Sequence, residues 1–355
     1  MARPLAILNV AFPFARVGPD AIGGAEQIVS ALDRALVLAG HRSIVIASDG
    51  SDVAGQLVPA GRGDSDMIDD AVRAATHASV RRAMDGVLDR MAIDVVHMHG
   101  IDFHAYLPAA GPPMLVTLHL PPAWYPAAAL RPERPGTWLH GVSRSQDVEL
   151  RRIVDHAAIM SPIPNGVPVE RLKGGPHARR GFALMLGRIC PEKGQHLGID
   201  AARKAGVPLL IAGDVFPYPA HRDYFASEIV PRLDAQHRWI GPVGFTRKRR
   251  LLSAARCLLV PSLVAETSSL VAMEAAACGT PVIAFRAGAL EETVELGCTG
   301  FLVSDVDEMA SAISRSATID GDTCRSVARA RFSADRMTGA YLRRYRMLAA
   351  AMVPV

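Results

Sequence analysis

The sequence predicts two α/β domains in tandem, each with a parallel β-sheet that is covered by helices on both faces. The chain has 355 residues, which is more than one hydrophobic core usually organises. Short apolar runs alternate with segments of helical periodicity along the chain, as in the βα repeats of parallel sheets. Proline, glycine and basic residues gather between the halves, at 162–168 and 173–180. We therefore expect domains at residues 1–172 and 173–333, and a helical segment, 334–355, that packs back towards the first domain.

The individual elements follow from the same patterns. In the first half, we expect strands at residues 5–10, 43–48, 95–98, 114–118 and 139–142, and helices at 25–39 and 68–91. In the second half, we expect strands at 182–186, 208–212, 239–240, 257–261 and 281–285, and helices at 195–204, 222–233, 247–255 and 269–278. The tail, 334–352, has the pattern of an amphipathic helix.

Composition limits where the chain works. Half of the residues are hydrophobic, yet no apolar stretch reaches the roughly 18 residues of a membrane-spanning helix, so we expect a soluble chain. The apolar residues after Met1 lack a cleavage site and fit a buried first strand better than a signal peptide. The five cysteines are scattered and form no C-x-x-C pair, which indicates a reducing cytoplasm and neither disulfides nor a zinc site.

Charge and missing motifs exclude several function classes. The net charge of +4 is modest, and the basic runs 247–250 and 343–346 are short. We expect these runs to be solvated helix faces; the alternative is peripheral contact with the inner face of an anionic membrane or with an acidic acceptor, and nucleic acid is not required. The G-x-G-x-x-G and Walker patterns are absent, which argues against a dehydrogenase and a P-loop ATPase.

The most specific motif lies between two predicted strands, at residues 261–284. A loop carries Glu266, Ser268 and Ser269 offer a helix N-cap, and an apolar helix then begins at Leu270. The free N–H groups and the positive dipole end of that helix predict an anion site near these residues.

Glu274 stands eight positions after Glu266. Along one helix the two carboxylates would be about 12 Å apart, beyond the roughly 5–9.5 Å of a hydrolase pair. We expect each carboxylate to bind a different part of one long ligand, because a carboxylate accepts hydrogen bonds from adjacent hydroxyls. The alternatives are an ordinary helix-start charge for Glu266 and a helix-face charge for Glu274, although an unpaired carboxylate among apolar residues would be costly.

Two further loops carry residues suited to phosphate. Gly187, Arg188 and Lys193 follow the first strand of the second half, and the two cations could neutralise a departing diphosphate. The alternative is a solvated loop with a salt bridge to Glu192. Near the N-terminus, Gly23 and Gly24 open the first helix, where paired glycines let a backbone approach a ligand closely.

Histidines gather in the first half of the chain, at positions 97, 99, 104 and 119. A strand would place His97 and His99 on one side, but no carboxylate or cysteine spacing completes a metal site. His119 ends a strand before a proline-rich loop, which is typical of a residue that contacts a ligand. His99 is either its neighbour or a packed core residue. The D-x-D sequences at Asp64/Asp66, Asp305/Asp307 and Asp320/Asp322 fit polar loops or helix starts.

Together these motifs resemble the GT4-type family of retaining glycosyltransferases. The resemblance rests on the E-x7-E element with Cys278–Val282, on the stretch from Gly187 to Gly194, and on the Gly23-Gly24-x-Glu26 sequence. It implies the GT-B fold, with two Rossmann-like domains that face each other across a cleft. The chain departs from the family pattern at Thr267–Ser269, where the family usually has a glycine.

The resemblance also implies roles for individual residues. Arg188 and Lys193 would hold the diphosphate, Glu274 the ribose hydroxyls, and Glu266 and His119 the donor sugar. Further donor contacts are implied for Gly23, Gly24, Gly187, Gly213, Asp214, Ser268, Ser269 and Leu270.

The function that we expect is a retaining transfer of a sugar from a nucleotide-diphosphate donor, UDP- or GDP-linked, without a metal or another cofactor. The acceptor would be a small molecule, a glycan or a lipid-linked sugar. Two alternatives stay open: a phosphorolytic enzyme or sugar-nucleotide epimerase on the same scaffold, and a non-catalytic protein that binds a sugar nucleotide.

Overall fold

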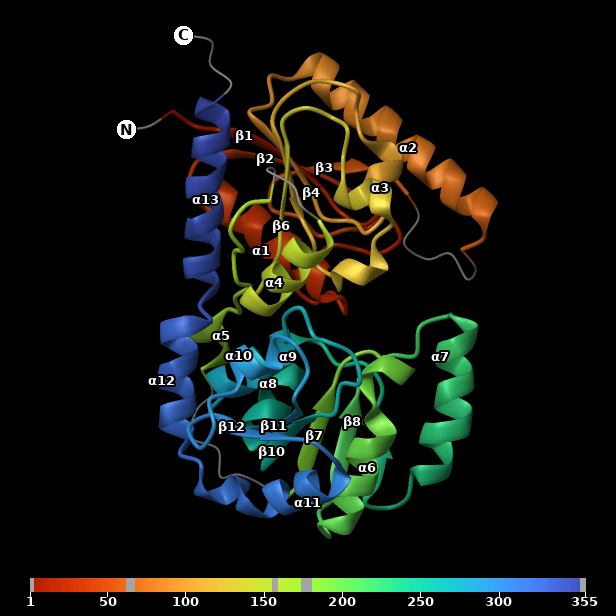
Figure 1. The fold of residues 1–355 in the computed structure, drawn as a ribbon, viewed down its shortest axis with the longest axis vertical. Coiled ribbons are helices and arrows are strands. Elements are labelled where there is room, and N and C mark those ends of the chain that lie inside the picture. The colour runs from red at the N-terminus through yellow and green to blue at the C-terminus, as the bar shows by residue number, and fades with distance from the viewer. Residues whose placement is uncertain (1–2, 62–67, 155–158, 174–180, 352–355) are drawn as a thin grey trace. The chain divides into compact units, whose positions relative to one another are not determined.

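A six-stranded, entirely parallel sheet lies at the centre of each of two units in the computed structural model (Figure 1). The structure describes residues 3–61, 68–154, 159–173 and 181–351. Internal contacts assign Met1–Pro164 and Arg336–Val355 to the first unit and Asn165–Asp335 to the second. Residues 165–172, which the sequence analysis grouped with the first domain, thus pack with the second unit.

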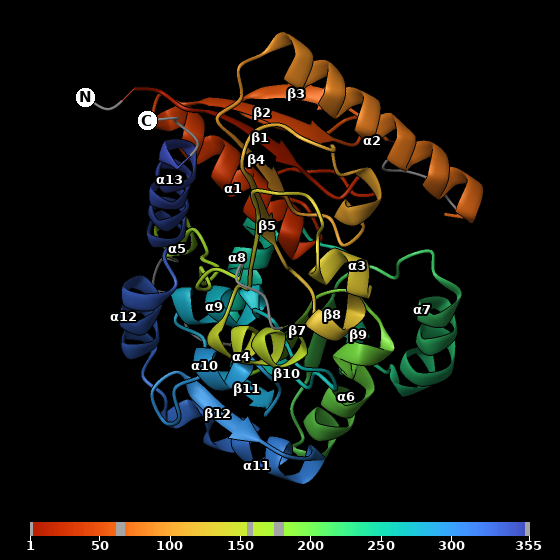
Figure 2. The same cartoon turned by 45° about the horizontal axis from the view of Figure 1, so that its top comes forward.

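The first sheet has the strand order β3-β2-β1-β4-β5-β6. Its strands are β1 (Ala6–Val10), β2 (Arg42–Ala47), β3 (Gln56–Pro59), β4 (Val95–Met98), β5 (Met114–Thr117) and β6 (Thr137–His140). Its helices are α1 (Gly24–Leu38), α2 (Asp70–Arg90), α3 (Ala127–Leu130), α4 (Arg144–Ile153) and α13 (Ala334–Ala350). Figure 2 shows the strands side by side. The order of the strands and their parallel direction are those of a doubly wound nucleotide-binding sheet.

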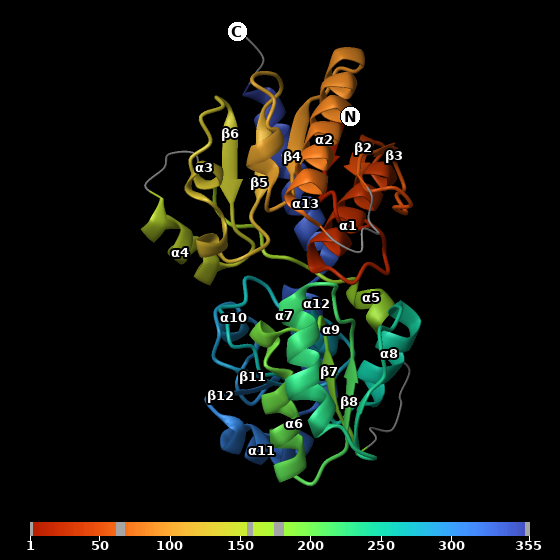
Figure 3. The same ribbon diagram turned by 90° about the vertical axis from the view of Figure 1, so that its right-hand side faces the viewer.

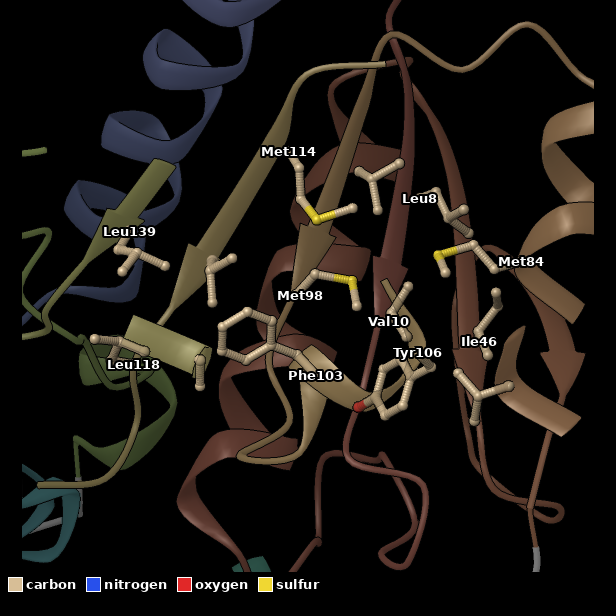
Figure 4. Packing of buried hydrophobic residues seen from close by; sticks show 14 of the residues in the cluster. Leu8, Val10, Ile46, Met84, Met98, Phe103, Tyr106, Met114, Leu118 and Leu139 are labelled. Atoms are coloured by element: carbon tan, nitrogen blue, oxygen red, sulfur yellow. The ribbon is translucent and has the colours of Figure 1, made fainter. Parts of the chain in front are cut away.

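Alternate residues of each strand fill the two faces of this sheet. On one face, Leu8 and Val10 of β1 and Met98 of β4 meet Met84 of α2 and Phe103 of a short 3₁₀ helix, Phe103–Tyr106 (Figure 4). This face is an ordinary hydrophobic core. The opposite face is apolar where β2 meets α1. On β4, β5 and β6 it carries polar groups, described below, and residues of α13 contact them.

The second sheet repeats the same order, β12-β11-β10-β7-β8-β9. Its strands are β7 (Ala183–Leu186), β8 (Leu209–Ala212), β9 (His237–Trp239), β10 (Cys257–Val260), β11 (Val282–Phe285) and β12 (Gly300–Val303). Its helices are α5 (Val169–Leu172), α6 (Gln195–Lys204), α7 (Pro219–Tyr224), α8 (Phe245–Ala254), α9 (Leu270–Ala277), α10 (Leu290–Thr293), α11 (Val306–Arg315) and α12 (Gly321–Arg331). One hydrophobic cluster lies between the sheet and α5, α8, α9 and α12, and another between the sheet and α6 and α11. Figure 3 shows the helices of this unit around its strands.

Two expected elements differ from the structure for identifiable reasons. The single helix expected at 222–233 is α7 followed by a π-helical turn, Phe225–Ile229, and a 3₁₀ turn, Val230–Arg232. Pro231 lacks the N–H that an α-helix needs and would clash with the carbonyl four residues earlier, so the helix changes its pitch there. The edge strand β3 was not expected, because its half-exposed residues and Pro59 form no apolar run.

No helix within the described residues combines the length and the apolar character that crossing a bilayer requires.

Candidate functional site

The carboxyl ends of β7 and β10 mark the point where strand order reverses in the second unit. β7 and β10 are neighbours, and the chain proceeds from β7 to β8 in one direction and from β10 to β11 in the other. In open parallel sheets, ligands bind outside the carboxyl ends of strands at such a point. The loops that follow these strands, 187–193 and 261–269, contain Arg188, Lys193 and Glu266, three of the residues predicted for the site.

Glu266 and Lys193 join these two loops directly. Lys193 Nζ donates to Glu266 Oε1 over 2.6 Å, and the Ser262 hydroxyl donates to the same oxygen. The Glu266 side chain is 9% exposed and that of Lys193 32%, so the pair is shielded more than a surface salt bridge. Lys193 pairs with Glu266 and not with Glu192, which the sequence analysis had named as its alternative partner.

The loop after β11 holds Glu266 from the other side. The Glu266 N–H donates to the Ala287 carbonyl over 3.2 Å, and the Ala289 N–H donates to the Glu266 carbonyl over 2.7 Å. Gly288 between them has φ +58°, and a Cβ there would lie 2.5 Å from the Glu266 carbonyl oxygen. Only glycine therefore fits this position. Sequence reasoning missed Gly288, because an isolated glycine in a loop is a common signal.

Gly187 and Gly213 bring the loops after β7 and β8 into backbone contact. A Cβ on Gly213, whose φ is +155°, would lie 1.7 Å from the Gly187 carbonyl oxygen. The Gly213 N–H donates to Gly241 over 3.0 Å. The side chain of Asp214 accepts from the backbone N–H of the next residue, Val215, over 3.0 Å. These predicted residues thus shape the loops through their backbone.

Arg188 is half-buried and lies over an aromatic ring. Its guanidinium carbon is 5.3 Å from the centre of the Phe216 ring, a cation–π distance. Its carbonyl accepts from Gln195 Nε2 over 2.6 Å. No carboxylate among the described residues forms an ion pair with Arg188, so its charge is available to an anion. Phe216 was not predicted, since only the fold brings it beside Arg188.

Three potential metal ligands lie next to Arg188. The ligand atoms of Cys190, Glu192 and His221 are all within 4.8 Å of one another. Burial raises the pKa of the Cys190 thiol to about 11, which opposes the thiolate that a metal ion would need.

Glu274 lies inside α9 and is paired with a lysine of α8. It is 2% exposed, and Lys248 Nζ is 2.5 Å from its Oε1. Burial raises the pKa of Glu274, and the charge of Lys248 opposes this rise. The Lys248 side chain is only 13% exposed, so the expectation of a solvated basic run was wrong at this position. The two residues are 26 positions apart, and no sequence pattern links them.

The start of α9 has no side-chain cap. Ser269 occupies the N-cap position, but its side chain makes no capping hydrogen bond, contrary to the expected role of the serine pair. Ser268 Oγ is buried and has no hydrogen-bond partner among the described residues. The first-turn N–H groups of α9 thus receive no hydrogen bond from the Ser269 side chain, and free N–H groups at a helix start are suited to bind anions.

The remaining predicted residues belong to the first unit. His119 follows β5, and its ring nitrogen Nε2 lies 3.0 Å from His99 Nδ1. The backbone N–H of His119 donates to the Tyr125 hydroxyl over 3.0 Å. Burial lowers the pKa of His119 to about 4. Gly23 is the N-cap residue of α1, and Gly24 is the first residue of the helix.

The D-x-D sequences act as helix starts where the structure describes them. Asp305 accepts from the Glu308 N–H and caps α11, and Asp320 accepts from the Thr323 N–H and caps α12. Asp64 and Asp66 lie outside the described residues.

Two family models match the chain one after the other. The model described as Glycosyltransferase Family 4 matches residues 22–171, and that described as Glycosyl transferases group 1 matches residues 181–318. The chain belongs to glycosyltransferase family 4. This confirms the resemblance inferred from the Glu266, Arg188 and Gly23 motifs.

Curated relatives match part of this family 4 chain. A D-inositol 3-phosphate glycosyltransferase of Mycobacterium avium (strain 104) is 33% identical over 178 residues, 46% of this chain and 41% of the relative. That of Mycobacterium tuberculosis (strain F11) is 34% identical over 176 residues, 47% of this chain and 33% of the relative. The chain thus spans less than half the length of these relatives.

Solved structures match the whole chain. AviGT4, a glycosyltransferase involved in avilamycin A biosynthesis, has 25% identity and a TM-score of 0.72, with 98% of both chains covered. Sucrose-phosphate synthase from Thermosynechococcus elongatus has 23% identity and a TM-score of 0.81, covering 98% of this chain and 100% of the other. HepE from Anabaena, in complex with UDP-glucose, has 19% identity and a TM-score of 0.74, covering 97% and 100%. These matches confirm the predicted GT-B fold.

Proposed function

We propose that this family 4 member is a retaining, metal-independent glycosyltransferase that moves a sugar from a UDP- or GDP-linked donor to an acceptor hydroxyl. The acceptor would be a small molecule, a glycan or a lipid-linked sugar. The observation that carries the proposal is the convergence of Arg188, Lys193, Glu266 and the uncapped start of α9 at the reversal point of the second sheet. Retention of configuration is taken from the family.

The diphosphate is assigned to Arg188, Lys193 and the start of α9. As the bond between the sugar carbon and the diphosphate oxygen breaks, negative charge grows on the leaving group. Fixed donors aimed at that charge stabilise the transition state more than the ground state. Arg188 is held over Phe216 without a carboxylate partner, and Ser268 Oγ is an unpartnered buried hydroxyl among the described residues.

The two glutamates are assigned to hydroxyl groups of the donor. Lys193 and Ser262 both bind Oε1 of Glu266, and Oε2 forms no hydrogen bond with a described residue. That oxygen is suited to accept from a sugar hydroxyl. Glu274 likewise uses only Oε1 to bind Lys248, which leaves Oε2 for a ribose hydroxyl. His119 is assigned a contact with the donor sugar.

Nucleotide binding is the first test. Thermal unfolding of the purified protein is measured with UDP, GDP, ADP and dTDP in turn. A diphosphate at about 100 times its Kd should stabilise the folded protein by about 2.7 kcal/mol, and one of the four should raise the melting temperature clearly above the others. If none of them shifts it, the donor-site assignment is wrong.

Variants test the individual residues. Arg188→Ala should lower transfer about 100- to 1000-fold, the cost of removing one donor to a developing anion, and Lys193→Ala and Glu266→Ala should each lower it by orders of magnitude while the fold persists. Lys204→Ala is the matched control, because Lys204 pairs with Asp307 at the exposed surface. Activity like that of the wild type in any of the three variants would remove that residue from the proposed site.

A further inference from the structure

The face of the first sheet that meets α13 carries buried polar side chains where a hydrophobic core would be expected. His97 of β4, Thr117 of β5 and His140 of β6 are each fully buried there. His97 Nδ1 lies 2.7 Å from the Tyr345 hydroxyl, and Tyr341 lies 3.2 Å from Thr117 Oγ1. Both tyrosines come from α13, which runs beside this unit (Figure 1).

The hydrogen-bond donors and acceptors among His97, Thr117 and His140 follow from the contact of His140 with one backbone carbonyl. His140 Nδ1 lies 2.9 Å from the Gly141 carbonyl oxygen, which can only accept, so Nδ1 carries the hydrogen and Nε2 accepts. Thr117 therefore donates to His140 Nε2 over 2.7 Å, and its oxygen accepts from His97 Nε2 over 2.7 Å. His97 Nδ1 must then accept from Tyr345. Each imidazole has one allowed tautomer.

His97 is in turn packed against His99. The ring centres of His97 and His99 are 3.9 Å apart, and those of His99 and His119 are 5.3 Å apart with nearly parallel planes. Burial lowers the pKa of His97 and His99 well below the ordinary histidine value. The three rings are therefore neutral and lie in a row, with His97 held by α13 and His119 at the far end.

A second chain of hydrogen bonds determines the proton of His119. Asn9 presents its side-chain oxygen to His99 Nε2 over 3.4 Å, while its amide nitrogen Nδ2 has no partner among the described residues. With the amide in this orientation, His99 donates from Nε2. A neutral His99 then has its lone pair on Nδ1. The facing nitrogen, His119 Nε2, lies 3.0 Å away and must be the donor.

We propose that His99 is a positioning residue that holds His119 in the tautomer with its hydrogen on Nε2 and its lone pair on Nδ1. In this state, His119 accepts a hydrogen bond from a hydroxyl of the donor sugar and supplies no proton to the reaction. The inference rests on the proposed contact between His119 and the donor. It assigns to His99 a role that neither the sequence motif nor the family match supplies.

The side chain that replaces His99 makes the test specific. In His99→Asn, the oxygen Oδ1 follows Cβ by the same number of bonds as Nδ1 of histidine and can accept from His119. In His99→Gln, the oxygen lies one bond further, at the position of Nε2, and in His99→Leu no acceptor is left. The asparagine variant should therefore preserve the role, whereas the glutamine and leucine variants should lose it.

The measurement is ¹⁵N NMR of the histidine side chains in the full chain, which contains 12 histidines. In the unliganded wild type and in His99→Asn, His119 should carry its hydrogen on Nε2 alone; in His99→Leu and His99→Gln its two tautomers should mix. A hydrogen on Nδ1 in the wild type, or the same His119 tautomer in all four proteins, would overturn the proposal. Circular dichroism identifies any variant that fails to fold. If His99→Leu or His99→Gln does not fold, the NMR spectra of the wild type and His99→Asn still test the tautomer of His119.

Turnover supplies a second measurement, the release of UDP from UDP-glucose. We expect a loss of at least about tenfold in His99→Leu and recovery in His99→Asn, with UDP binding unchanged in both. Equal release by the wild type and His99→Leu would contradict the positioning role. If the wild type releases no UDP from UDP-glucose, that result counts against the proposed donor, while the NMR spectra still decide the role of His99.

Discussion

Replacing Lys248 with methionine should destabilise the second unit in a way that depends on pH. Methionine keeps the length of the aliphatic stem but removes the ammonium that lies 2.5 Å from Glu274 Oε1. Glu274 is 2% exposed, so its carboxylate would be left buried without a counter-charge. Lys248 is the charged group that opposes the effect of burial on the pKa of Glu274.

The size of the effect follows from burial. Removing one partner of a buried ion pair typically costs about 3–5 kcal/mol. In a unit of this size, each kcal/mol lowers the melting temperature by about 2–4 °C, so a fall of about 6 °C or more is expected at pH 8. Burial raises the pKa of Glu274 in the folded chain, and without Lys248 the pKa rises further. In the variant, the folded state then binds a proton at Glu274 more tightly than the unfolded state does. The loss of stability caused by Lys248→Met is therefore largest at high pH and becomes smaller as the pH falls.

The assay is denaturant unfolding of wild type and variant between pH 8 and pH 5. Arg250→Met is the matched control, since it removes an exposed charge from the same helix. In the double variant Lys248→Met/Glu274→Gln, the carboxylate is absent, and most of the lost stability should return. A loss below about 1 kcal/mol in Lys248→Met, or a loss that is equal at both ends of the pH range, would refute this reasoning.

Three further predictions concern the fold and the histidine face. Gly213→Ala should abolish stable folding of the second unit, because its Cβ would lie 1.7 Å from a backbone oxygen. Gly206→Ala is the control: Gly206 has φ +65° and nothing within 4 Å of the new Cβ, so this change should cost only about 1–2 kcal/mol of stability. Equal losses of melting temperature in the two variants would contradict the close contact at Gly213. Tyr345→Phe should lower the free energy of unfolding by about 1–3 kcal/mol, since it leaves His97 Nδ1 without its donor. In the control Tyr218→Phe, the changed side chain is exposed, and the free energy of unfolding should hardly change. Burial lowers the pKa of His119 to about 4 and of His140 to about 3 from 6.5, so the unfolded chain takes up protons first as the pH falls. Stability should therefore decline by about 1.4 kcal/mol per pH unit for each histidine between about pH 6.5 and pH 4, and a flat profile in this range would exclude neutral buried histidines.

Much of the fold was predictable because its elements have a clear period. The strand expected at 95–98 and the helix expected at 195–204 coincide with β4 and α6, as both are bounded by residues that end a regular element. β6 lies at Thr137–His140, two residues before its expected position, because its register is set by pairing with Met114–Thr117 of β5. Such pairing depends on another strand and leaves no local signal.

The candidate site was predictable where residues of one motif share one loop, and not where distant segments meet. Arg188, Lys193 and Glu266 could be named because each follows a strand that ends at the same sheet edge. Phe216 and Lys248 could not, since their partners lie 28 and 26 positions away (216 − 188 and 274 − 248) on other elements. The Ser269 cap was expected from residue type alone, but capping also depends on the local conformation. Ser269 has φ −93° and ψ 88°, and its side chain makes no capping hydrogen bond.

The tyrosines of α13 also constrain the order in which the chain can complete its folding. The first unit draws residues from both sides of the second unit in the sequence, and Tyr341 and Tyr345 are made after all of its strands. During synthesis, the second unit can therefore close while the histidine face of the first still awaits the hydroxyl groups that satisfy it. A nascent chain that stops at residue 335 would expose His97 and Thr117 to water. Packing of α13 is therefore the step that completes the hydrogen bonds of this face.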